Sequence, residues 1–152
     1  MPKIVKYAPM GELLWKRQKT GYLFIEEPVL NVISSYRQTR ASDTEAGGLL
    51  SGYYKGDHLH ITNLTVPQPR DIRGRYSFKR RDLKHVKTVT HWYQKSSGQI
   101  NCLGEWHTHP ESNPSPSTTD INSWQRINST RRDQEAIFLI AGIQCIWAGE
   151  CF

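Results

Sequence analysis

The chain has 152 residues, of which 37% are hydrophobic and 22% charged, a composition typical of one globular domain and unlike that of a disordered chain. Its most apolar stretch, residues 136–149, is interrupted by Gly142 and Gln144 and is shorter than the ~20 residues that a membrane helix needs. The net charge of +6 suits an acidic protein partner as well as nucleic acid, so it indicates neither by itself.

The first half of the chain predicts a strand, a helix and a hairpin. Residues 22–26 favour a short strand, and Pro28 suits the first turn of a helix. One face of that helix is apolar: Val29, Val32, Ile33 and Tyr36. The glycine-rich segment 47–54 and a return strand over 58–66 flank a turn of hairpin composition. Residues 67–77, with two prolines and three arginines, predict a loop.

The second half predicts two helices and three strands. A helix over 80–95 ends at the Ser-Ser-Gly of 96–98, and four of its residues are expected to face inward: Leu83, Val86, Thr90 and Tyr93. A strand over 100–109 leads into a proline-rich loop at 110–116. A third helix opens at 117–120 with Ile121, Trp124 and Ile127 or Asn128 along its length, and two strands at 136–141 and 143–148 close the chain. This order of elements predicts a mixed sheet covered by helices.

The segment from Gly104 to Pro110 carries the chemistry. Alternate side chains of a strand share a face, so His107 and His109 project the same way. A carboxylate arriving from the start of a nearby helix would be a third ligand for one metal ion. Two nitrogens and one oxygen with a fourth position open are typical of a catalytic zinc site, where the metal lowers the pKa of bound water to about 7.

The spacing of these residues resembles that of the JAMM (MPN-plus) family. The pattern H-x-H, seven residues, S, two residues, D runs from His107 to Asp120 without a gap, and residues 45–52 match the upstream E-x-G-G-x-L-x-G segment. The resemblance implies that His107, His109 and Asp120 bind zinc, one ion per chain. It also implies that Glu45 is the general acid/base and that Ser117 donates to the oxygen of the tetrahedral intermediate.

The same resemblance implies a fold. The expected architecture is α/β (α+β): one JAMM/MPN domain over residues 1–152, with a motif-bearing core at about 22–150. Its mixed, curved sheet would be flanked by helices in a cytidine-deaminase-like arrangement.

A second histidine pair serves as a control within the sequence. His58-x-His60 is followed by Asp71 at a similar spacing, but Gln68 stands at the serine position. No separate E-x-G-G segment precedes it, so 58–71 is interpreted as a hairpin strand and its exit. His85 and His91, on the second predicted helix, are interpreted as solvated or packing residues.

Glu105, the Ser117–Asp120 pair and Cys102 each have more than one possible role. Glu105 falls on the histidine face of its strand and could orient a ligand from outside the metal's immediate contacts; Glu45 is preferred as base because of its glycine context. Ser117-x-x-Asp120 is also a helix-capping pattern, and capping is compatible with catalysis. Cys102 is interpreted as a small strand residue rather than a ligand. With only three cysteines and no C-x-x-C pair, reduced thiols are expected.

The longer string L-G-E-W-H-T-H-P-E over residues 103–111 is similar to a bacterial subgroup, the JAMM proteins of integrative and conjugative elements and of type II CBASS antiphage operons. There the JAMM protein removes conjugates formed when E1/E2-like machinery joins the C-terminus of a cGAS-like nucleotidyltransferase to a target lysine. This resemblance implies an isopeptidase that cleaves directly after that C-terminal residue. An extended tail could align along the strand ending at His109 or against the 67–78 loop.

Two other interpretations stay open at this point. The protein could be a JAMM deconjugase for a ubiquitin-like protein outside CBASS. It could also be a non-catalytic MPN scaffold or a nucleic-acid-associated module, although the intact ligand pattern and the absence of a recognisable base-stacking motif argue against these. No signal-peptide apolar core is present, so a bacterial cytoplasmic protein without membrane partners is expected.

Overall fold

The computed structural model describes residues 3–11, 13–18, 20–130 and 136–151. The strands are β1 (Lys3–Pro9), β2 (Leu14–Lys16), β3 (Tyr22–Ile25), β4 (Gly47–Lys55), β5 (His58–Leu64), β6 (Ile72–Arg73), β7 (Phe78–Lys79), β8 (Asn101–Thr108), β9 (Ala136–Ala141) and β10 (Cys145–Cys151). The helices are α1 (Glu27–Ser35), α2 (Lys84–Lys95) and α3 (Thr118–Thr130). Arg131 and Arg132, part of the basic charge in the sequence, lie outside the described residues.

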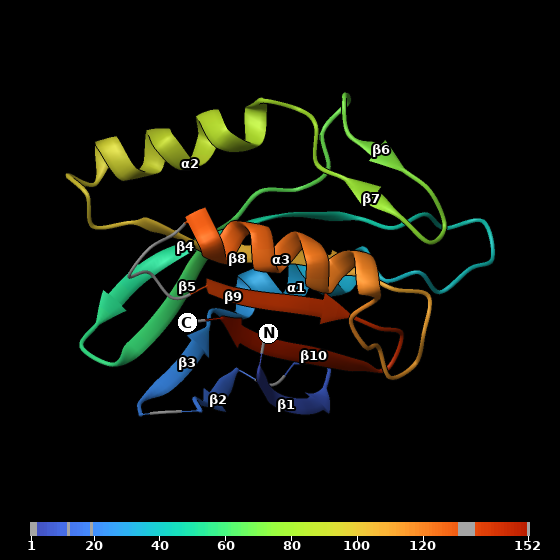
Figure 1. Cartoon of the computed structure of the whole chain (residues 1–152), viewed down its shortest axis with the longest axis horizontal. Helices are drawn as coiled ribbons and strands as arrows, with labels where there is room; N and C mark the ends of the chain where they lie inside the picture. The colour runs from blue at the N-terminus through green and yellow to red at the C-terminus, as the bar shows by residue number, and fades with distance from the viewer. Residues whose placement is uncertain (1–2, 12, 19, 131–135, 152) are drawn as a thin grey trace.

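Eight strands form one curled sheet in the order β1-β10-β9-β8-β4-β5-β3-β2 (Figure 1). The pairs β8–β9 and β3–β5 are parallel, and the remaining pairs are antiparallel. The sheet is therefore mixed, and the sequence-based prediction of a helix-covered mixed sheet is confirmed. At the seam between the sheet's two ends, buried Arg17, just after β2, pairs with buried Glu150 of β10 at 2.7 Å.

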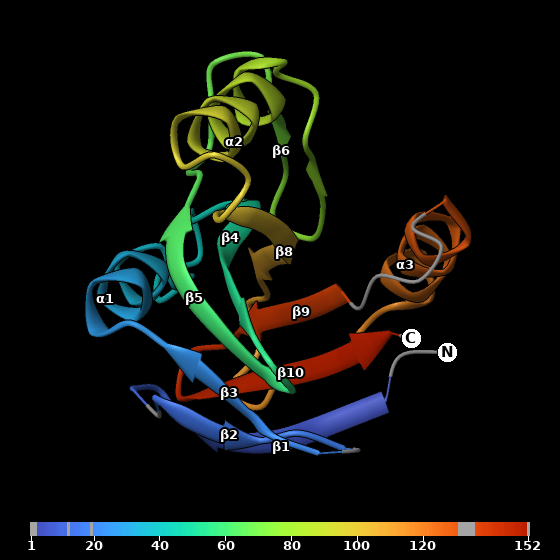
Figure 2. The ribbon, with the colours of Figure 1, turned by 90° about the vertical axis from the view of Figure 1, so that its left-hand side faces the viewer.

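Helices cover the sheet from opposite sides, with α1 on one side and α3 on the other (Figure 2). The larger core lies on the α1 side, where Val29, Leu30 and Ile33 pack with strand residues. The smaller core lies under α3, where Trp124 packs with four strand residues: Ala136, Phe138, Ile140 and Trp147. Burial of apolar side chains is the main source of stability. Trp106 of β8 lies in the larger core and Trp124 of α3 in the smaller one, so the segment with the histidines is anchored at both ends.

Residues 67–77 contain more order than the predicted loop. β6 pairs with β7, joining Ile72 to Lys79 and Arg73 to Phe78. Two residues per strand are too few to give an alternating pattern in the sequence, which is why the prediction missed this hairpin. The strands β1 and β2 were missed as well, because three-residue and N-terminal edge strands have weak periodicity.

The predicted inward face of the second helix is wrong. Leu83, Val86 and Tyr93 are 66%, 48% and 49% exposed, while His85 and Val89 are buried. The helix also begins at Lys84 rather than at residue 80. Because a buried polar anchor at His85 sets the rotation of α2, the apolar pattern points outward. Among the described residues, no helix is long and apolar enough to span a membrane.

Candidate active site

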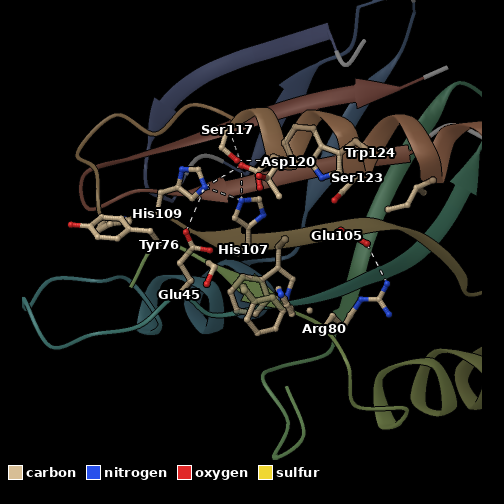
Figure 3. Close-up of a pocket in the computed structure, with 18 of the residues that line it drawn as sticks. Glu45, Tyr76, Arg80, Glu105, His107, His109, Ser117, Asp120, Ser123 and Trp124 are labelled. Atoms are coloured by element: carbon tan, nitrogen blue, oxygen red, sulfur yellow. Dashed lines mark hydrogen bonds and ion pairs between the residues drawn. The ribbon is translucent and has the colours of Figure 1, made fainter. Parts of the chain in front are cut away.

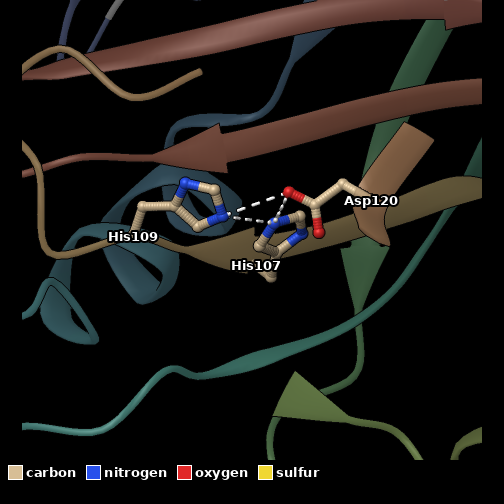
Figure 4. Close-up of side chains that lie close together, drawn as sticks. All are labelled: His107, His109 and Asp120. Atoms are coloured by element: carbon tan, nitrogen blue, oxygen red, sulfur yellow. Dashed lines mark hydrogen bonds and ion pairs between the residues drawn. The ribbon is translucent and has the colours of Figure 1, made fainter. Parts of the chain in front are cut away.

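Three side chains converge where β8 ends and α3 begins (Figure 4). The Nε2 atoms of His107 and His109 lie 3.1 Å apart. Asp120 Oδ2 lies 3.3 Å from His107 Nε2 and 3.2 Å from His109 Nε2. Strand alternation places the two imidazoles on one face, and the loop that follows returns the carboxylate to them.

These distances fit a single metal ion. Zinc takes histidine nitrogen and carboxylate oxygen at 2.0–2.2 Å, and a tetrahedral arrangement then places the ligand atoms ~3.3 Å from one another. When the two rings are neutral, each of these three atoms can also donate a lone pair to a metal ion. The three residues are thus a group that could hold a metal.

Glu111 orients one of these histidines, and the sequence analysis did not single it out. Its Oε1 lies 2.9 Å from His109 Nδ1, so the ring donates its Nδ1 hydrogen there and leaves Nε2 free for a metal. Carboxylate–histidine contacts of this kind fix the tautomer of metal ligands and raise their basicity. The available signal was a carboxylate only two residues after His109 in the sequence.

The electrostatics of the group attract positive charge to its midpoint. Burial opposes the ionisation of Asp120, but His107 and His109 outweigh it and hold the pKa of this carboxyl far below its usual range. Burial likewise opposes the charged form of His109, yet Asp120 and Glu45 outweigh it and raise its pKa. The same negative carboxylates would attract a bound metal cation.

Asp120 is held from two directions. Ser117 N–H donates to Asp120 Oδ2 at 2.8 Å, and Asp120 N–H donates to Ser117 Oγ at 3.1 Å, which is a reciprocal cap of α3. Trp124 stacks on Phe138 and Trp147, with ring centroids 4.5 and 5.4 Å apart, and thereby anchors α3 on the sheet. Ser117 Oγ accepts in this cap, so its own hydrogen remains available to a ligand in the cavity.

Glu45 enters the group from the segment before β4. Its Oε1 lies 3.8 Å from His109 Nε2, and the side chain is 6% exposed. Burial raises the pKa of Glu45 to about 7, against the opposing influence of His107 and His109. A carboxyl poised near neutral pH suits general acid/base work, and a cation bound beside it would lower that pKa again.

The glycines after Glu45 allow two close approaches. A Cβ at Gly47 would lie 2.8 Å from the Phe78 ring, and one at Gly48 would lie 2.0 Å from Thr65 O. Any side chain here would push β4 away from its neighbours. The E-x-G-G pattern therefore reflects packing that brings the hairpin and the β5 exit against the site.

The group opens into a cavity of about 940 Å³ (Figure 3). The β6–β7 hairpin and its flanks form one wall with Tyr76, Phe78 and Arg80, and α3 contributes Ser123 and Ile127. Glu105 also lines this cavity, where its carboxylate pairs with Arg80 at 3.3 Å. Figure 3 shows that pair at the opposite end of the cavity from Glu45.

The control pair of histidines does not form a comparable group. His60 Nε2 contacts Glu26 at 2.8 Å, His58 Nδ1 accepts from Tyr22 N–H at 3.0 Å, and Asp71 contacts His85. These residues have separate partners on separate elements, which supports the interpretation of 58–71 as a hairpin strand and its exit. Cys102 lies partly buried within β8 and is not in the group that could hold a metal.

A curled mixed sheet with two histidines at the end of a central strand and an aspartate at the start of the next helix defines a class of candidate metal-dependent hydrolases. Residues 27–148 match the family described as prokaryotic homologs of the JAB domain, and the chain belongs to this family. The JAMM-type family predicted from the sequence pattern is thereby confirmed.

The chain also resembles proteins whose names give an activity in addition to a family. The chain is 39% identical over 141 residues to a CD-NTase/cGAS isopeptidase of Escherichia coli, with 93% of this chain and 89% of that protein covered. It is 36% identical to a protein of the same name from Vibrio cholerae, with coverages of 91% and 88%. A solution structure of protein DSY2949 from Desulfitobacterium hafniense, at 20% identity, has a TM-score of 0.55 over 80% of this chain and 75% of that one, which shows the fold alone.

Proposed function

We propose that the protein is a zinc-dependent isopeptidase in which His107, His109 and Asp120 bind one zinc ion. The observation that carries this proposal is the 3.1–3.3 Å convergence of their ligand atoms beside a buried carboxylate in an open cavity. Bound zinc would supply Lewis acidity and make hydroxide available at neutral pH. We further propose that the chain forms a single domain over residues 1–152.

The chain's own residues would carry the proton and the oxyanion. Glu45 takes the proton of the attacking water and delivers it to the leaving amine nitrogen, a role suited to its buried carboxyl. The Ser117 hydroxyl donates to the oxygen of the former carbonyl as negative charge develops there. Glu105 would have a supporting role only: its carboxylate pairs with Arg80 and so helps to hold the cavity wall.

The metal assignment is tested by elemental analysis of purified variants. We expect about one zinc per chain, lost in His107→Ala and in Asp120→Ala because each removes a ligand. His58→Ala is the matched control, since its histidine belongs to the other H-x-H pair, and it should retain zinc. Full zinc in a variant lacking both His107 and His109 would refute the assignment.

We infer that the substrate is the C-terminal tail of a cGAS-like nucleotidyltransferase joined to a target lysine. The support is that three relatives named CD-NTase/cGAS isopeptidase are 36–42% identical to this chain. An extended tail cannot add to the strand that ends at His109, because β8 is paired on both edges at its site end by β4 and β9. In the described residues, β7 is paired with β6 alone. A tail adding beside β7 would thus run toward the metal group.

The substrate assignment is tested with two purified fusions. One carries the tail of a nucleotidyltransferase encoded in the same operon, joined to a reporter; the other carries ubiquitin joined to the same reporter. We expect cleavage of the first directly after the last tail residue and a much slower reaction with the second. Cleavage of ubiquitin with an intact matched tail would favour a deconjugase that acts outside CBASS.

A further inference from the structure

A buried chain of three polar side chains connects α2, the sheet and the hairpin segment, outside the group at the metal site. His85 on α2 is 0% exposed. Its Nδ1 lies 2.6 Å from Thr65 Oγ1, and its Nε2 lies 2.6 Å from Asp71 Oδ2. Burying an imidazole and a carboxylate away from water is costly unless every polar atom has a partner. Both ring nitrogens of His85 have one, so the buried side chain holds its two partners in place.

The partners assign one protonation pattern. The carboxylate of Asp71 only accepts, so His85 Nε2 carries the hydrogen donated to it. In the neutral ring Nδ1 then accepts from the Thr65 hydroxyl, whose oxygen also accepts from Leu49 N–H at 2.8 Å. A neutral imidazole satisfied at both nitrogens is a rigid link with a defined direction.

Asp71 closes the base of the hairpin segment. Its Oδ2 accepts from Gln68 N–H at 2.8 Å, and its Oδ1 accepts from Arg81 N–H and Asp82 N–H at 2.9 and 3.0 Å. Burial opposes the ionisation of Asp71, but the Asp82 backbone and His85 outweigh it and lower its pKa. One carboxylate therefore joins the two ends of the segment that carries β6 and β7.

Thr65, at the other end of these three hydrogen-bonded side chains, is fixed to the sheet. Besides Leu49 N–H on β4, it receives Trp106 Nε1–H at its carbonyl oxygen, at 2.9 Å. Trp106 immediately precedes His107 on β8. The three side chains and the Thr65 carbonyl thus connect the base of the hairpin to β4 and to β8, the strand that carries His107.

We propose that His85 is a positioning residue that holds the base of the β6–β7 hairpin against the sheet, through Asp71 and Thr65, and thereby sets the cavity wall that binds the substrate tail. The wall consists of Tyr76, Phe78 and Arg80. The inference rests on the proposed function in one respect, that a peptide tail is the ligand of this cavity.

Two substitutions separate the two halves of the link. In His85→Gln the amide nitrogen replaces Nε2 and still donates to Asp71. In His85→Asn the shorter amide still accepts from Thr65 but no longer reaches Asp71. His91→Asn is the matched control, because His91 lies on the same helix and is exposed.

The measurements are the KM and kcat of tail cleavage, and the Kd of the tail for zinc-loaded chains that also carry Glu45→Gln. We expect His85→Asn to raise KM and Kd about tenfold, the scale of a lost hydrogen bond to a charged group, with kcat changed less than about threefold. His85→Gln should restore tail binding to within about threefold of the wild-type value, and His91→Asn should have no effect. Hydrogen exchange at Gln68, Arg81 and Asp82 should accelerate in His85→Asn alone.

An unchanged Kd in His85→Asn, with faster unfolding as the only defect, would overturn the proposal and leave His85 a core residue. Equal loss of tail binding in His85→Gln and His85→Asn would also overturn it, because the Asp71 link would then be irrelevant. If the wild-type protein cleaves no tail, the proposed function fails. The exchange rates still decide in that case whether His85 holds the hairpin base.

Discussion

Replacing Gly48 with alanine tests how β4 and the β5 exit are packed around the site. The added Cβ would lie 2.0 Å from Thr65 O and 2.7 Å from Thr65 Oγ1. Thr65 cannot yield easily, because Thr65 N–H donates to Leu49 O at 2.9 Å and Leu49 N–H donates to Thr65 Oγ1 at 2.8 Å. Relief of the clash would require a backbone shift of about 1 Å and would break these bonds.

The expected cost follows from those contacts. Overpacking costs about 1–3 kcal/mol, and two lost buried hydrogen bonds add about 1 kcal/mol each. A domain of this size loses about 2–4 °C in Tm per kcal/mol, so Gly48→Ala should lower Tm by roughly 6–20 °C. Thermal unfolding followed by circular dichroism measures this.

The control is Gly56→Asn, at a hairpin turn with φ +59° and nothing within 4 Å of an added Cβ. Asparagine tolerates this conformation, so its Tm should change little. If Gly48→Ala unfolds within about 2 °C of the wild-type protein, or no earlier than Gly56→Asn, the close approach to Thr65 does not constrain the fold as described.

Four further predictions concern the base, the oxyanion donor, a buried ion pair and a buried carboxylate. Glu45→Gln should retain zinc while activity falls at least ~100-fold; a fall of less than tenfold would exclude Glu45 as the base. Ser117→Ala should reduce kcat less than Glu45→Gln does, because zinc also polarises the carbonyl; the opposite order would contradict this. Arg17→Met leaves Glu150 buried without its cation and should cost about 3–5 kcal/mol in urea unfolding, most of it recovered when Glu150→Gln is added. Folding lowers the pKa of Asp71 from its ordinary value of 3.8. Its charge therefore stabilises the fold above pH 3.8, and this contribution is lost as the pH falls below that value. The destabilisation by Asp71→Asn should be largest at neutral pH and shrink toward about pH 3.

The sequence predicted that His107, His109 and Asp120 lie together because their geometry is local. His107 and His109 share a strand face by alternation, and Asp120 lies in the first turn of the helix whose start Ser117 caps. Only the return of the loop between them needed tertiary information. Glu45 was predicted only from the resemblance of residues 45–52 to the JAMM pattern, since nothing local indicates that residue 45 approaches residue 109. Their proximity depends on the β4–β8 pairing of Gly47 with His107.

The features that the sequence pattern does not predict depend on long-range contacts. The inward face of α2 was predicted from apolar spacing, yet His85 is buried because Thr65 and Asp71 satisfy it. The strands of the β6–β7 hairpin are too short to show periodicity. Their position against Gly47 and Glu45 became visible only in three dimensions, where Arg73 Nε donates to Glu45 O at 2.7 Å.

The proposed reaction is zinc-dependent hydrolysis of one bond directly after a nucleotidyltransferase tail. The most direct measurement is the mass of the products when the zinc-loaded protein, its Glu45→Gln variant and the chelated protein are each incubated with the same tail–reporter fusion. We expect two fragments whose masses sum to that of the fusion plus one water, with the cut directly after the last tail residue. These fragments should form with the wild-type protein, disappear on chelation, return with added zinc, and be absent with Glu45→Gln. Undiminished cleavage after chelation, or by the Glu45→Gln variant, would contradict it.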